Sequence, residues 1–211
     1  MRLSLFNAIN CTGAILLNNI PRPILNRMRY LEEIDTRDRS DGTERMDRLR
    51  QIPPESGKFI ALMAVSAPPG DILEIGTSAG YSTLWLALAA RERKCKILTF
   101  ETLKKKVTLA EQTFTDAAVT DVVSLIAEDA LNQIEKYPGT AFCFLDAEKE
   151  VYAACYKEVI PVLASGGLLI ADNVISHKKD LQPWVDSVLQ DTRVDAIVVP
   201  IGKGLLLCRK R

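Results

Sequence analysis

The stretch ILEIGTSAGYSTLWLALA, residues 72–89, decides the fold because it joins a short apolar run to a helical pattern through two glycines. The apolar run has the length of a buried strand, and the pattern after it has the spacing of a helix. Glu74, Gly76 and Gly80 mark the sharp turn between them, where the backbone can approach a ligand closely. The two glycines stand four residues apart, so the turn differs from the dinucleotide fingerprint G-x-G-x-x-G.

The alternation of apolar runs and amphipathic segments continues along the chain, which is typical of strands joined by helices in a parallel sheet. Strands are predicted at residues 71–75, 96–101, 122–126, 141–146, 166–172, 194–201 and 204–210. Helices are predicted at residues 82–90, 104–118, 130–136, 152–163 and 181–190. Only Gly202 and Lys203 separate the last two strands, so those strands must form an antiparallel hairpin. The sequence therefore predicts an α/β fold, a Rossmann-like, doubly wound, seven-stranded mixed sheet of five parallel strands plus a C-terminal antiparallel hairpin, with helices on both faces.

The first quarter of the chain has a different composition. We interpret residues 1–51 as an N-terminal extension of short helices and residues 52–211 as the main domain. The segment TRDRSDGTERMDRLRQ, residues 36–51, is almost entirely polar and of mixed charge. Such a segment is typical of a solvated helix or a flexible stretch, and the functional alternatives are a contact in an oligomer or a lid over the site.

The composition excludes several classes of protein. Hydrophobic residues make up 47% and charged residues 26%, which indicates a globular domain. Lys plus Arg and Asp plus Glu number 27 each, so no net charge favours a nucleic-acid partner. No apolar run approaches the roughly 18 residues of a membrane span. The five cysteines include no C-x-x-C pair, and Asn7 and Asn10 interrupt the apolar start, so we expect a reduced, cytoplasmic protein without a signal peptide.

A second acidic residue narrows the class of ligand that is expected at the glycine turn. Glu101 follows the second predicted strand, where an acid can accept hydrogen bonds from both hydroxyls of a ribose. Asp129 and Ala130 follow the third strand, where they can contact an adenine. Ligands of such sheets bind outside the carboxyl ends of the strands, near the switch point. The pattern therefore predicts a site for an adenosine-containing ligand.

The next two strands end in oxygen-bearing side chains. Asp146 follows the fourth strand in FLDAEK, and Asp172 and Asn173 follow the fifth in IADN. Two carboxylates and an amide suit Mg²⁺, or alternatively Mn²⁺ or Ca²⁺, better than zinc, and Mg²⁺ is the expected ion. Lys149 lies three residues past Asp146. If a bound metal lowers the pKa of Lys149 by like-charge repulsion, this lysine can act as a general base toward a substrate hydroxyl. His177, the only histidine, is given no role.

From about residue 53 to the C terminus, the chain resembles the metal-dependent O-methyltransferases of the catechol and caffeoyl-CoA type. The resemblance rests on the segments PPESGKFIALM, LEIGTSAGYSTLWLA, FLDAEKEVY, GGLLIADNV and VVPIGKGLLLCRK, in that order, together with Glu101. FLDAEK and ADNV are its specific parts. The N terminus differs from both named branches, and Glu128 stands where the family often has glycine.

The resemblance implies an S-adenosylmethionine-dependent O-methyltransferase that acts on a small, hydroxylated, catechol-like substrate and assembles as a homodimer. It implies that Asp146, Asp172 and Asn173 hold the metal and that Lys149 is the base. The implied S-adenosylmethionine pocket consists of Glu74, Gly76, Gly80, Tyr81, Ser82, Glu101, Asp129, Ala130 and Asp146, with Ser82 at the methionine carboxylate. Two alternatives stay open, a metal-independent methyltransferase acting on nitrogen or RNA and a non-catalytic protein that binds S-adenosylmethionine.

Overall fold

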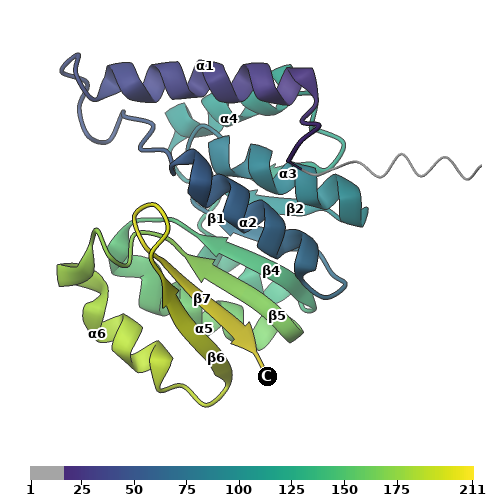
Figure 1. Ribbon diagram of the computed structural model, residues 1–211, viewed down its shortest axis with the longest axis vertical. Coiled ribbons are helices and arrows are strands. Elements are labelled where there is room, and N and C mark those ends of the chain that lie inside the picture. The colour runs from purple at the N-terminus through teal and green to yellow at the C-terminus, as the bar shows by residue number, and fades with distance from the viewer. Residues whose placement is uncertain (1–16) are drawn as a thin grey trace, which may run out of the picture.

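The structure, a computed structural model, describes residues 17–211 and contains one seven-stranded sheet with helices on both faces (Figure 1). The strands are β1 (Ile72–Ile75), β2 (Ile97–Phe100), β3 (Val123–Ile126), β4 (Thr140–Leu145), β5 (Leu163–Ala171), β6 (Val194–Val199) and β7 (Leu205–Lys210). The helices are α1 (Arg22–Asp38), α2 (Pro54–Ser66), α3 (Tyr81–Arg93), α4 (Lys104–Asp116), α5 (Tyr152–Val162) and α6 (Lys178–Leu189).

The strands lie in the order β3-β2-β1-β4-β5-β7-β6. The first five strands of the chain pair in parallel, and β7 pairs antiparallel with both β5 and β6. The chain moves outward from β1 to β3 on one side and then resumes with β4 on the other, so the switch point lies between β1 and β4. The predicted doubly wound, mixed sheet is confirmed.

The two faces of the sheet have separate cores. Side chains alternate along β4, so that Phe142 and Phe144 pack under α1 to α4, while Cys143 and Leu145 pack under α5 and α6. All four side chains are fully buried. Cys143 and Cys208 are thus small core residues, whereas Cys11 lies outside the described residues.

The described part of the N-terminal extension is one 17-residue helix and a loop, where the sequence predicts short helices. α1 starts directly after Pro21, and Pro23 stands within its first turn, which proline tolerates because the amide there has no partner inside the helix. Met28 and Leu31 of α1 enter the same core as α2 and α3. No helix among residues 17–211 has both the length and the apolarity needed to cross a bilayer.

Two other predicted elements differ from the structure. Residues 130–136 form two single 3-10 turns, η1 (Ala130–Asn132) and η2 (Ile134–Lys136), instead of a helix. Seven residues make too few backbone hydrogen bonds to offset helix nucleation, and the Asp129 side chain caps only the first turn. The hairpin loop is also longer than predicted, because β6 ends before Pro200, which has no amide to donate to the ladder.

A buried acid attaches α3 to the sheet. Glu74 on β1 is fully buried and accepts hydrogen bonds from the hydroxyls of Ser82 (2.6 Å), Thr83 (2.5 Å) and Thr99 (2.6 Å). Burial raises the pKa of Glu74 to about 7, and the hydrogen bonds only partly oppose this shift. Glu74 therefore links the first turn of α3 to β1 and β2.

The packing of α1 can be tested by truncating one of its core side chains. Leu31→Ala should lower the free energy of unfolding by about 2–5 kcal/mol, because Leu31 is 1% exposed and the change leaves a cavity. Urea denaturation measures this, with Leu62→Ala on α2, where the side chain is 48% exposed, as the control. The control should change stability by no more than about 0.5 kcal/mol. Equal effects of the two variants would show that α1 does not share the core.

The burial of Glu74 predicts a pH dependence of stability. Its pKa is higher in the folded chain than in the unfolded chain, so the folded state binds more protons between pH 4.5 and about 7, and stability falls as the pH rises through that window. The expected loss is on the order of 3 kcal/mol. Glu74→Gln should flatten the slope in urea denaturation from pH 5 to pH 8, whereas Glu111→Gln, an exposed acid on α4, should not. A slope unchanged by Glu74→Gln would contradict this role.

Candidate active site

The register of the sheet brings the predicted residues together. Ile75 of β1 is paired with Phe100 of β2 and with Leu145 of β4, and Leu145 is paired with Ala171 of β5. All four strands end at these residues. The residues that follow therefore lie side by side along one edge of the sheet, in the order Glu101, Gly76, Asp146 and Asp172.

A pocket of about 720 Å³ opens over this edge, a volume within the range of small-molecule sites. Nine of the predicted site residues line it, namely Gly76, Tyr81, Ser82, Glu101, Asp129, Ala130, Asp146, Lys149 and Asn173. Three do not line it, namely Glu74, Gly80 and Asp172. Glu74 is buried and Gly80 directly precedes α3. The contacts of all twelve residues with a cofactor, metal or acceptor stay a prediction.

Gly76 lets the turn after β1 approach the loop after β4. Its φ angle is +101°, and a Cβ atom there would lie 2.2 Å from the carbonyl oxygen of Asp146. Only glycine combines this backbone conformation with so close a contact. Gly76 is therefore required because the turn after β1 lies so close to the backbone at Asp146 that no side chain fits between them.

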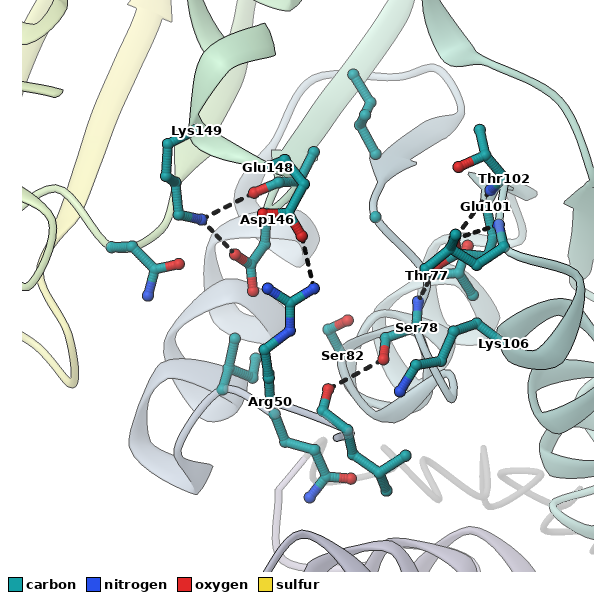
Figure 2. A pocket seen from close by; sticks show the side chains of 18 of the residues that line it. Arg50, Thr77, Ser78, Ser82, Glu101, Thr102, Lys106, Asp146, Glu148 and Lys149 are labelled. Atoms are coloured by element: carbon teal, nitrogen blue, oxygen red, sulfur yellow. Dashed lines mark hydrogen bonds and ion pairs between the residues drawn. The ribbon is translucent and has the colours of Figure 1, made fainter. Parts of the chain in front are cut away.

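Glu101 is held rigidly at the end of β2. Its carboxylate accepts hydrogen bonds from the backbone amides of Ser78 (2.8 Å), Thr102 (2.9 Å) and Leu103 (2.9 Å) (Figure 2). A carboxylate offers about four acceptor positions, so Glu101 keeps capacity for a ligand hydroxyl. This geometry is suited to binding the ribose of an adenosine-containing cofactor.

Asp172 is an unpaired acid beside a second acid. Its side chain is 0% exposed, and neither carboxylate oxygen has a hydrogen-bond partner within residues 17–211. Burial and, to a smaller extent, the charge of Asp146 raise the pKa of Asp172 to about 7. Asn173 follows with a φ angle of +66° and is also buried.

This donor set fits a hard cation. A buried carboxylate without partners is costly, and a bound cation beside Asp146 and Asp172 would offset that cost. Within residues 17–211, no three His, Cys, Asp or Glu side chains group as a metal site, but the predicted set needs only two carboxylates, with the Asn173 amide as third donor. Oxygen donors of this kind suit Mg²⁺, Mn²⁺ or Ca²⁺.

Lys149 is fixed next to Asp146. Its Nζ atom lies 3.2 Å from Oδ1 of Asp146, and it donates to the carbonyl of Ala147 (2.9 Å) and the hydroxyl of Tyr152 (2.8 Å). The Tyr152 hydroxyl in turn donates to the backbone carbonyl of Asp172 (3.2 Å), and burial keeps the pKa of Tyr152 well above its usual value. The amine is thus held beside the predicted metal ligands, at what we call the acceptor end of the pocket because Lys149 is the predicted base.

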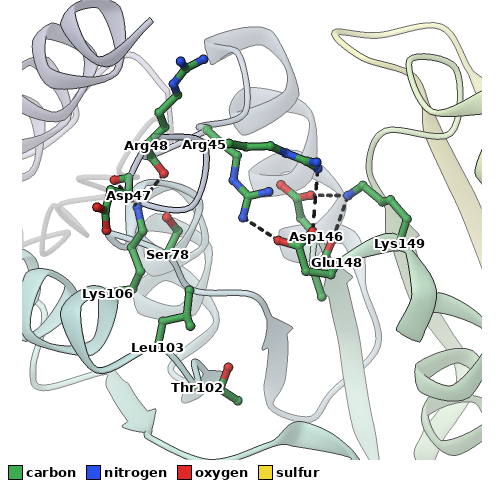
Figure 3. Close-up of polar contacts among 12 residues, drawn as sticks. Arg45, Asp47, Arg48, Ser78, Thr102, Leu103, Lys106, Asp146, Glu148 and Lys149 are labelled. Atoms are coloured by element: carbon green, nitrogen blue, oxygen red, sulfur yellow. Dashed lines mark hydrogen bonds and ion pairs between the residues drawn. The ribbon is translucent and has the colours of Figure 1, made fainter. Parts of the chain in front are cut away.

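The loop at residues 45–52, which we call the strap, forms a pocket wall that the sequence left undecided. Lys106 of α4 donates to the carbonyls of Asp47 (3.1 Å) and Arg48 (2.6 Å), and Ser78 donates to the carbonyl of Leu49 (3.0 Å) (Figures 2 and 3). These contacts hold the strap against α4 and the glycine turn, at the end of the pocket where Glu101 lies. Residues 45–52 are thus attached to the pocket wall, which supports the alternative of a segment that covers the site over that of a flexible, solvated stretch.

On the opposite side, the strap reaches the loop after β4. Arg50 forms an ion pair of 2.6 Å with Glu148, and Lys203 donates to the carbonyl of Gln51 (3.2 Å). His177 also lines this end of the pocket, and its pKa is lowered by burial and by the charge of Lys149. Sequence reasoning missed Arg50, Lys106 and Lys203, because their contacts join segments far apart in the chain.

Curated relatives include catechol and caffeoyl-CoA O-methyltransferases. A catechol O-methyltransferase of Niastella koreensis is 33% identical over 135 residues, which are 62% of this chain and 61% of that protein. Caffeoyl-CoA O-methyltransferase 2 of Populus trichocarpa is 27% identical over 181 residues, 74% of this chain and 73% of that protein. The match thus spans about three fifths of the Niastella enzyme.

Solved structures share the fold. The SAH-bound methyltransferase PaMTH1 of Podospora anserina has a TM-score of 0.73 at 24% identity and covers 91% of this chain and 89% of its own. The O-methyltransferase of Bacillus cereus in complex with SAH has a TM-score of 0.71 at 23% identity, and the match covers 88% of this chain and 91% of that chain. The model of the O-methyltransferase family matches residues 28–211, which include every predicted site residue. The chain belongs to the O-methyltransferase family.

Proposed function

We propose that the chain is an S-adenosylmethionine-dependent O-methyltransferase that methylates a hydroxyl of a small, catechol-like aromatic acceptor with the help of a divalent metal. The observation that carries the proposal is Asp172, a fully buried carboxylate without partners within residues 17–211, next to Asp146 and in the same row as Glu101. A cofactor site and a cation site on one sheet edge are what a metal-assisted methyl transfer needs. The catechol and caffeoyl-CoA relatives support this acceptor class.

The cofactor would lie between the ends of β1, β2 and β3. Glu101 would accept the ribose hydroxyls, and Asp129 and Ala130 would contact the adenine. Ser82 donates its hydroxyl hydrogen to Glu74, and Tyr81 and Ser82, the first two residues of α3, line the pocket. Amides at a helix N terminus favour an anion, which supports the expected position of the methionine carboxylate.

Asp146, Asp172 and Asn173 would hold the metal, with Mg²⁺ as the expected ion and Mn²⁺ or Ca²⁺ as alternatives. When bound, the ion would supply the positive charge that lowers the pKa of an acceptor hydroxyl. Asp172 supplies a charge with no competing hydrogen bonds in the described chain. Asp146 is shared with Lys149.

Lys149 would take the proton. In its unprotonated form, its amine accepts the proton of the attacked hydroxyl. The acceptor oxygen then forms a bond with the methyl carbon while the sulfur–carbon bond breaks, and the positively charged sulfonium becomes a neutral thioether. Ala147 and Tyr152 orient the amine through the hydrogen bonds described above.

The direct test is transfer of a labelled methyl group from S-adenosylmethionine to catechol, in Mg²⁺ and in EDTA. We expect methylated catechol only with the metal. Transfer that continues unchanged in EDTA would instead favour a metal-independent methyltransferase. Cofactor binding without transfer to any acceptor would favour a non-catalytic binding protein.

Asp172→Asn separates the metal role from a structural one. The variant should lose methyl transfer by at least about 100-fold, because one ligand charge is removed. In metal-free buffer it should nevertheless be at least as stable to urea as the wild type, because a buried charge without partners has been neutralised. Activity assays and urea denaturation measure the two effects. A variant that is both fully active and much less stable would contradict the assignment.

A further inference from the structure

Two arginines of the strap converge on one exposed acid at the mouth of the pocket. Arg50 lies 2.6 Å from Oε1 of Glu148, and Arg45 lies 3.9 Å from Oε2 of the same carboxylate. Figure 3 shows Arg45 reaching across the pocket toward Glu148 and Lys149. Glu148 is the second residue after Asp146, so the arginines stand at the predicted acceptor end.

The guanidinium groups have donors to spare. The Arg45 side chain is 68% exposed. Within residues 17–211, its guanidinium makes no hydrogen bond, and its contact with Glu148 is an ion pair of 3.9 Å. Arg50 is 37% exposed and uses one terminal nitrogen on Glu148. A guanidinium carries five N–H donors in a planar fork, which suits a carboxylate or phosphate group.

The guanidinium of Arg50 points toward Glu148 rather than toward Ser78 and Glu101 (Figure 2). In both close-up views, Ser78 and Thr102, near Glu101, lie on one side and Asp146, Glu148 and Lys149 lie on the other (Figures 2 and 3). An acceptor whose hydroxyls face Asp146 would direct its far end toward the mouth of the pocket. Near Glu148, the pocket is lined by the two arginines together with His177, Lys203, Glu150 and Asp180.

We propose that Arg45 and Arg50 bind an anionic substituent of the acceptor, so that the preferred acceptor is a vicinal aromatic diol that carries a negative charge. This inference rests on the proposed function. Glu148 acts as an internal competitor that holds the two guanidiniums in place until the acceptor anion arrives. The anion can belong to a phenolic acid or to a larger thioester such as a coenzyme A derivative.

The inference is tested by comparing acceptors that differ in charge. With saturating S-adenosylmethionine and Mg²⁺, kcat/KM should be highest for 3,4-dihydroxybenzoate, lower for catechol and lowest for 3,4-dihydroxyphenylethylamine. The advantage of the acid over catechol should shrink as salt is raised, because exposed charges are screened. Caffeoyl-CoA, assayed beside caffeate, distinguishes the thioester from the free acid as the source of the anion.

Removing an arginine and removing Glu148 should change the preference for the anionic acceptor in opposite directions. Arg45→Gln and Arg50→Gln should each lower the acid-to-catechol ratio of kcat/KM by about fivefold, the size expected for an exposed ion pair. Glu148→Gln should raise the ratio, because the competing carboxylate is gone. Lys105→Gln is the matched control, since it removes one positive charge that pairs with Asp47 of the strap but does not line the pocket, and it should leave the ratio unchanged.

The outcomes separate the inference from the function on which it rests. If catechol is methylated but the anionic acceptors gain no advantage, or if Lys105→Gln lowers the ratio as much as Arg45→Gln, the inference is wrong while the proposed function stands. If no diol of any charge is methylated, the proposed function itself fails.

Discussion

Four neighbouring parallel strands end at the same level of the sheet, and the candidate site depends on this register. Because Phe100, Ile75, Leu145 and Ala171 are paired, the residues after them form one row, in which Glu101, Gly76 and the two further acids are neighbours. Gly76 makes the row tight, since any side chain there would collide with the carbonyl of Asp146. A shift of one residue in any of these strands would move its terminal side chain to the other face of the sheet.

Two buried acids near this row have different roles because their partners differ. Glu74 accepts three hydroxyl hydrogen bonds and attaches α3, so its burial is satisfied within the protein. Asp172 has no partner in the described chain, and burial raises the pKa of both acids to about 7. The contrast is the physical reason to assign a structural role to Glu74 and a cation to Asp172.

Most of the fold could be predicted because hydrophobic periodicity is local. Strand ends at Glu101, Asp146 and Asp172 could be read directly, and parallel pairing placed them on one edge. The 3-10 turns at residues 130–136 were missed because seven residues leave helix and turn close in energy. The strap could not be assigned, since its charges have no period and its contacts with Lys106 and Glu148 cross 58 and 98 positions of the chain. Pocket residues of this kind depend on tertiary contacts rather than on local pattern.

The central claim, that a metal joins the two acids beside a bound cofactor, is tested most directly by calorimetric titration of Mg²⁺ into the chain saturated with S-adenosylmethionine. The structure offers one pair of acids at the end of β4 and β5, so binding should saturate at about one ion per chain. Heats no larger than those of diluting Mg²⁺ into buffer, with S-adenosylmethionine still bound, would contradict it.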